Sequence, residues 1–128
     1  MQVTGIDRAK ATRGNPRSFD GEVNVQTLVS SSGEEPELLA VFFNPGARTF
    51  PHVHEHDQNL HIIAGKGIVA TETEKYFVTE GDLVTVPAGT WHWHGATQDT
   101  ALCHISIKRP GNDNWSVDRK NWDSGYDA

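Results

Sequence analysis

Cysteine, methionine and tyrosine are scarce in this chain of 128 residues, which holds one Cys, one Met and two Tyr. A single cysteine, Cys103, excludes an internal disulfide and fits a reducing compartment, so we expect a cytoplasmic protein. The first residues lack the apolar core of a secretory signal. No apolar run approaches the roughly 18 residues that a membrane-spanning helix needs, so we expect no membrane partner.

Positive charge is also limited, because 11 Lys and Arg face 17 Asp and Glu and give a net charge of -6. This balance argues against nucleic acid or an anionic membrane as the main partner. The candidate site described below makes a small-molecule substrate the expected partner. The chain has no Ser-His-Asp order, no phosphate-binding loop and no Cys-x-x-Cys motif. Its length fits one domain, residues 1–128, that buries a core of its own.

Short Val-, Ile- and Phe-rich runs separated by Gly, Pro, Asn and Asp predict about ten strands and no long helix. This pattern is typical of an all-β sandwich or closed barrel. The strands are expected at residues 2–6, 19–29, 38–43, 59–64, 68–73, 75–78, 83–86, 91–95 and 101–108, with a helical turn at 7–11 and a tight turn at 65–67. Residues 1–37 would supply N-terminal strands, about 38–108 the barrel core, and 109–128 a tail anchored by Trp115 and Trp122.

All seven histidines lie between His52 and His104. Residues two apart on a strand share a face and are roughly 6.6 Å apart, so His52 and His54 can lean onto one metal ion. Gln58 follows at an even offset and can supply an amide oxygen. His92, after Pro-Ala-Gly, is the expected fourth ligand. Three neutral imidazoles and a neutral amide leave a divalent ion its full charge, which favours anions and lowers the pKa of a bound group.

For the other four histidines the spacing predicts a strand face or a role outside the ligand set. His94 shares the face of His92 and is expected, as a residue of the catalytic group, either to support the metal ligands or to contact the substrate. His56 should lie at the pocket rim, and His61 should face away from the metal. His104 lies on one strand face with Ser106 and Lys108, and the pattern leaves open whether that face lines the cavity. If it does, a neutral imidazole there is a good general base. The expected pocket residues are Phe42, Phe50, Leu60 and Lys108, with Arg48 and Trp93 beside them.

Two motifs resemble those of the cupin family. The motif G-x5-H-x-H-x3,4-E-x6-G appears as Gly46, His52, His54, Gln58 and Gly65, with Gln in place of Glu. The motif G-x5-P-x-G-x2-H-x3-N appears as Gly81, Pro87, Gly89 and His92, with Ala96 in place of Asn. The resemblance implies a double-stranded β-helix (a jelly-roll barrel) with one metal ion inside, in a homodimer or higher homo-oligomer.

A narrower resemblance extends over nearly the whole chain. The runs Pro45-Gly-Ala-Arg-Thr, His52-x-His-x3-Gln-x-Leu and His92-Trp-His-Gly-Ala are similar to those of small bacterial manganese cupins that act as hydroxynitrile lyases. This similarity implies that His52, His54, Gln58 and His92 bind Mn(II), with Fe, Zn or Ni as other choices, and that His104 is the catalytic base. Departures such as Phe50-Pro51 and Leu39 alter the size and polarity of the pocket.

Three other functions fit the same residues. Three histidines with open positions can bind Fe(II) and O₂, as in a non-haem iron oxygenase. A sugar-acid isomerase or tautomerase would need a polar pocket. A ligand-binding or sensory barrel would hold a structural metal with a closed coordination shell, whereas four protein donors leave two positions of an octahedral ion open.

Overall fold

The computed structural model describes residues 1–115, and within them Gly, Pro and Asn turns separate twelve strands from one short 3-10 turn. Asp7 caps that turn, because its side chain accepts from the backbone N–H of Ala9. The elements are η1 (Arg8–Lys10), β1 (Thr12–Arg13), β2 (Phe19–Asp20), β3 (Val23–Val29), β4 (Glu37–Phe43), β5 (Arg48–Thr49), β6 (Val53–His54), β7 (Gln58–Ala70), β8 (Lys75–Thr79), β9 (Leu83–Val86), β10 (Trp93–Ala96), β11 (Leu102–Lys108) and β12 (Asp113–Asn114). No helix in this part of the chain is long and apolar enough to cross a membrane.

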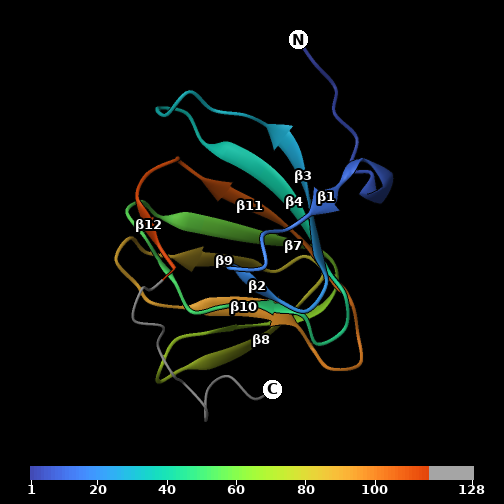
Figure 1. Cartoon of the computed structure of the whole chain (residues 1–128), viewed down its shortest axis with the longest axis vertical. Coiled ribbons are helices and arrows are strands. Elements are labelled where there is room, and N and C mark those ends of the chain that lie inside the picture. Colours follow the sequence, from blue (N-terminus) through green and yellow to red (C-terminus); the bar gives the residue numbers. More distant parts are fainter. Residues whose placement is uncertain (116–128) are drawn as a thin grey trace.

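The strands form an antiparallel sheet in the order β1-β3-β4-β11-β7-β10-β5-β2, and β8 and β9 also pair with β7. The long strand β7 belongs to both halves of this arrangement. Its first half pairs with β11 and β9, and its second half pairs with β10 and β8. The sheet therefore curls around an interior (Figure 1), and the predicted all-β barrel is confirmed.

Two predicted elements are wrong. Residues 2–6 form no strand, although the carbonyl of Gly5 accepts a hydrogen bond from the side chain of Gln26. Residues 65–67 form no tight turn but lie within β7. Gly65 has φ +84°, and a Cβ there would lie 1.8 Å from the carbonyl oxygen of Ala101, so this glycine allows close packing of two strands.

The faces of β4 and β11 decide which side chains reach the interior. Val41 and Phe43 belong to the main core with Leu60. Phe42 points the other way and packs with Ala40 and Cys103. A thiol buried in this way acts as a small apolar group, and burial raises the pKa of Cys103.

Candidate metal centre

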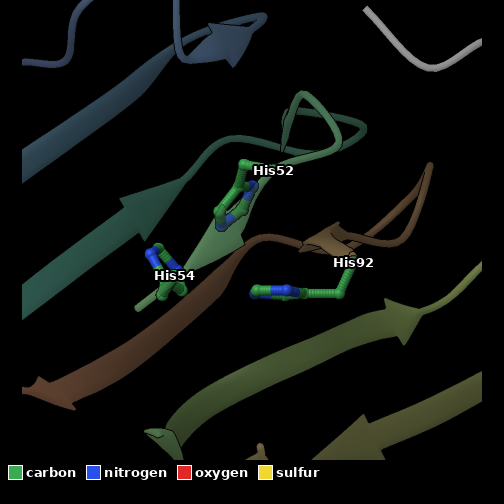
Figure 2. Close-up of side chains that lie close together, drawn as sticks. All are labelled: His52, His54 and His92. Atoms are coloured by element: carbon green, nitrogen blue, oxygen red, sulfur yellow. The ribbon is translucent and has the colours of Figure 1, made fainter. Parts of the chain in front are cut away.

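Three histidines from two segments converge inside the barrel (Figure 2). His54 ends β6, and His52 lies two residues before it, so both side chains point to the same side. His92 precedes β10, and its backbone exchanges two hydrogen bonds of 2.9 Å with His52. The possible ligand atoms of the three side chains all lie within 4.8 Å of one another, and all three residues are buried.

The outer nitrogen of each imidazole is held by an oxygen. Nδ1 of His52 donates to the carbonyl of Phe50 at 2.7 Å, and Nδ1 of His92 donates to the carbonyl of Thr90 at 2.8 Å. Nδ1 of His54 lies 2.9 Å from Oδ1 of Asp113. Because a carbonyl or carboxylate oxygen can only accept, each Nδ1 carries the proton and each Nε2 keeps its lone pair.

The amide oxygen of Gln58 completes the group of donors. Oε1 lies 3.1 Å from Nε2 of His54 and 3.2 Å from Nε2 of His92, while the amide nitrogen donates to Oγ of Ser106 at 2.9 Å. Two donors bound at right angles to one ion at about 2.1 Å are about 3 Å apart, so these separations fit shared coordination.

The hydrogen-bond pattern at this site calls for a cation. With Nδ1 of His92 protonated by its bond to a carbonyl, a neutral imidazole offers only a lone pair toward Oε1 of Gln58, which is also an acceptor. A divalent ion among these atoms would turn an unfavourable contact of acceptors into coordination bonds. The four side chains thus fit the metal that the sequence predicts.

A second histidine pair lies beside the ligands. Nε2 of His104 is 3.1 Å from Nδ1 of His94, and both side chains are buried. Nε2 of His94 and Nδ1 of His104 have no hydrogen-bond partner within residues 1–115. In either tautomer of the pair, one of these two atoms carries a hydrogen and the other a lone pair, so the pair can accept a proton at one end and donate one at the other.

Burial keeps these imidazoles neutral. It lowers the pKa of His104 to about 4 and that of His92 to about 4. Burial also holds the pKa values of His52 and His94 well below 6.5, and neighbouring histidines lower them further. A base that stays neutral in a dry cavity is ready to accept a proton from a substrate.

A cavity of about 140 Å³ opens onto this group and contains His52, His54, Gln58, His94 and His104. Its other walls are apolar or polar side chains from several strands, namely Phe19, Val25, Leu39, Val41, Thr49, Ser106, Lys108, Glu37, Asp113 and Trp115. A larger hollow of about 330 Å³ between β8 and β9 reaches His92 alone among the ligands. The smaller cavity is therefore the candidate substrate site.

Only some of the predicted pocket residues line the cavity. Lys108 lines the cavity, whereas the prediction for Phe42 is wrong because its side chain lies on the outer face of β4. Phe50 is half-buried and contributes its carbonyl rather than a cavity wall. The prediction for Leu60 is also wrong, because it is fully buried in the main core and does not line the cavity.

The remaining assigned side chains also have clear positions. Trp93 was expected near the pocket, but it packs with Ile68 and Ala70, and the guanidinium of Arg48 lies 4.7 Å from its ring centre. His61 is exposed, as its parity predicts, and His56 is half-buried. Trp122 lies outside the described residues.

Comparison with known proteins agrees with this site. The family model for the cupin domain matches residues 40–108. The chain belongs to the cupin family. It is 33% identical over 114 residues to an (R)-mandelonitrile lyase from Granulicella tundricola, covering 84% of each chain. It is 31% identical over 90 residues to a 1-methylthio-D-xylulose 5-phosphate methylsulfurylase from Rhodospirillum rubrum, covering 68% of this cupin and 58% of the relative.

A solved structure confirms the cupin fold. A cupin-like protein from Thermotoga maritima superimposes with a TM-score of 0.80 at 33% identity, covering 84% of this chain and 85% of that one. The barrel, the buried histidine cluster and the family match therefore agree with one another.

Sequence reasoning missed two residues of this cupin site. Asp113 accepts from His54, and Trp115 stacks on His52 with ring centres 3.9 Å apart and planes at 17°. Both lie in a polar tail, and in its described part, residues 109–115, the strand β12 has two residues and no alternation. Two tryptophans in a short tail predict that the tail is anchored on the barrel. Nothing in the sequence pattern predicts that Asp113 or Trp115 contacts the metal ligands.

The buried histidines make the metal-free cupin sensitive to acid. The unfolded state binds protons near pH 6.5, whereas His92 and His104 in the fold do so only near pH 4. The stability that these two histidines provide is therefore complete above about pH 6.5 and is lost as the pH falls toward 4. Each unit of difference between the unfolded and the folded pKa of a histidine corresponds to about 1.4 kcal/mol.

We expect urea unfolding of the metal-free protein to show a free energy of unfolding several kcal/mol lower near pH 4 than at pH 7. The variant His61→Gln, which replaces an exposed histidine, should follow the wild-type profile. A free energy of unfolding that stays constant over this range would contradict neutral buried histidines.

Proposed function

We propose that this cupin is a metal-dependent lyase that cleaves and forms the C–C bond of small hydroxynitriles. The observation that carries the proposal is the buried His94–His104 pair, which lines the same cavity as His52, His54 and Gln58 and has two nitrogens without a hydrogen-bond partner within residues 1–115. The similarity to an (R)-mandelonitrile lyase over 84% of the chain supports the same reaction class.

The histidine pair of the cavity would act as the base of the reaction. His104, or His94 in the other tautomer, takes the hydroxyl proton of the substrate. The electrons of that O–H bond form the carbonyl, the C–C bond breaks, and its electron pair leaves with cyanide. The proton then passes to cyanide, so an aldehyde and hydrogen cyanide are the products.

A divalent ion bound by His52, His54, Gln58 and His92 supplies Lewis-acid stabilisation of negative charge, and we propose Mn(II). The chain would contribute a neutral ligand set, which would leave a divalent ion its full charge. Val25, Leu39 and Val41 give the cavity apolar walls against which the body of a hydroxynitrile could pack.

The direct test is to follow aldehyde release from mandelonitrile in mildly acidic buffer, where spontaneous decay is slow. Protein loaded with Mn(II) should release aldehyde well above the background rate, and removal of the metal with a chelator should return the rate to background. Failure to cleave any of a panel of aromatic and aliphatic hydroxynitriles, with one metal bound per chain, would refute the reaction. Substrate-dependent oxygen uptake by Fe-loaded protein would then favour an oxygenase.

A further inference from the structure

Residues 112–115, here called the clasp, contain β12 (Figure 1), which pairs with β6, the short strand that ends at His54. β12 pairs with β6 so that Asp113 lies opposite His54. The backbone N–H of Asn112 donates to Oε2 of Glu55 at 2.8 Å. We propose that the clasp orients two of the three histidine ligands and that its Trp115 forms the wall against which flat, apolar substrates bind.

This inference rests on the proposed function in one respect, because it takes the three-His, one-Gln group as a metal centre. Asp113 acts through His54. Its Oδ1 lies 2.9 Å from Nδ1 of His54, and its Oδ2 lies 3.6 Å from Nζ of Lys108. The side chain of Lys108 is only 13% exposed, so the carboxylate is held between two partners in a partly dry environment.

Asp113 differs from the backbone carbonyls that accept from the other two histidines, because it is a carboxylate. His52 and His92 donate to backbone carbonyls, whereas His54 donates to a carboxylate. The carboxylate of Asp113 bridges the imidazole N–H of His54 and the ammonium group of Lys108, so it sits between a donor and a cation. A carboxylate on the outer nitrogen fixes the tautomer and makes the ligand nitrogen a stronger donor to a metal.

Trp115 supports the second ligand and forms a wall of the cavity. Its ring stacks on His52, and its centre is 6.3 Å from that of Phe19. Both aromatic residues line the cavity, as do Val25 and Leu39. The indole thus fixes the plane of one imidazole and gives the cavity an aromatic surface, which favours a substrate with a flat apolar body.

A clasp that only anchors the tail would affect stability alone. A clasp that orients His54 would also affect metal affinity. Titration of the folded, metal-free protein with Mn(II) measures this affinity and so distinguishes the two roles. Asp113→Ala should weaken binding about 10- to 100-fold. Asp113→Asn keeps an acceptor oxygen but loses the charge, so it should fall between Asp113→Ala and the wild type. Asp99→Asn, in an exposed turn where Oδ1 of Asp99 accepts hydrogen bonds from Thr97 and Thr100, is the matched control.

The outcomes are distinct. Unchanged affinity in both Asp113 variants, with a lower melting temperature of the metal-free protein, would overturn the positioning role and leave the proposed function standing. A folded wild-type protein that binds no metal would refute both proposals. A wild type that binds metal but cleaves no hydroxynitrile would refute the reaction alone.

The wall formed by Trp115 has its own readout. Trp115→Leu should raise KM for mandelonitrile severalfold, with a smaller change in kcat and little change in KM for an aliphatic hydroxynitrile. Binding of Co(II) should also quench a part of the tryptophan emission that Trp115→Phe removes and Trp91→Phe retains. Equal quenching in both variants, or an equal rise in KM for both substrates, would overturn this role of Trp115.

Discussion

Replacing His104 with alanine should lower kcat for hydroxynitrile cleavage by a factor of about 10² to 10⁴ and leave the metal content unchanged. His104 is 1% exposed, and burial lowers its pKa to about 4, so it is a neutral base at working pH. It contacts His94 and lies outside the group of four predicted ligands. Its removal should therefore affect proton transfer rather than metal binding.

Two further variants exclude a packing effect of the lost side chain. His104→Gln keeps a hydrogen-bonding group of similar length but no base, so it should be nearly as slow as His104→Ala. His61→Ala removes an exposed histidine and should retain wild-type turnover. Full turnover of His104→Ala on every substrate that the wild type cleaves would show that this residue is not the base.

Gln58→Glu should retain the metal but lower kcat roughly 100-fold. The variant keeps an oxygen at the position that lies 3.1 Å from Nε2 of His54, but it adds a negative charge there. A unit charge about 4 Å away at an effective dielectric constant of about 20 contributes about 4 kcal/mol. Because about 1.4 kcal/mol corresponds to a factor of ten in rate, even half of this value has a large effect.

Metal content and kinetics are measured on the same preparation of Gln58→Glu. Ser106→Ala is the matched control, because it removes the partner of the Gln58 amide nitrogen without changing the charge. It should lower kcat much less than Gln58→Glu does. Wild-type kcat in Gln58→Glu would show that the neutral ligand set is unimportant.

The clustering of the histidines could be predicted in part from local spacing. His52 and His54 share a strand face by the period of two, and Gln58 begins the next strand at an even offset. His92 joins them through its backbone bridge to His52, which the spacing of Pro87 and Gly89 indicates only with knowledge of the family. The position of His104 needed the three-dimensional structure, because both faces of β11 are largely buried.

The incorrect predictions for Phe42 and for residues 65–67, and the missed clasp, all depend on tertiary packing that leaves no local sequence pattern. Residues 38–43 form an apolar run without polar alternation, so nothing in the pattern distinguishes the inward face of Phe43 from the outward face of Phe42. The glycines at 65 and 67 resemble a turn, but tertiary packing uses them for close approach within one long strand. The clasp depends on long-range contacts between residue 113 and residue 54, which carry no local pattern.

The central claim is that His52, His54, Gln58 and His92 hold one divalent metal ion. It is tested most directly by elemental mass spectrometry of protein purified without chelator or nickel resin, alongside Gln58→Ala and His92→Ala. The account predicts about one Mn or Fe per wild-type chain and a large loss of metal in both variants. Negligible metal in the folded wild type, even after reloading with Mn(II) or Fe(II), would contradict it.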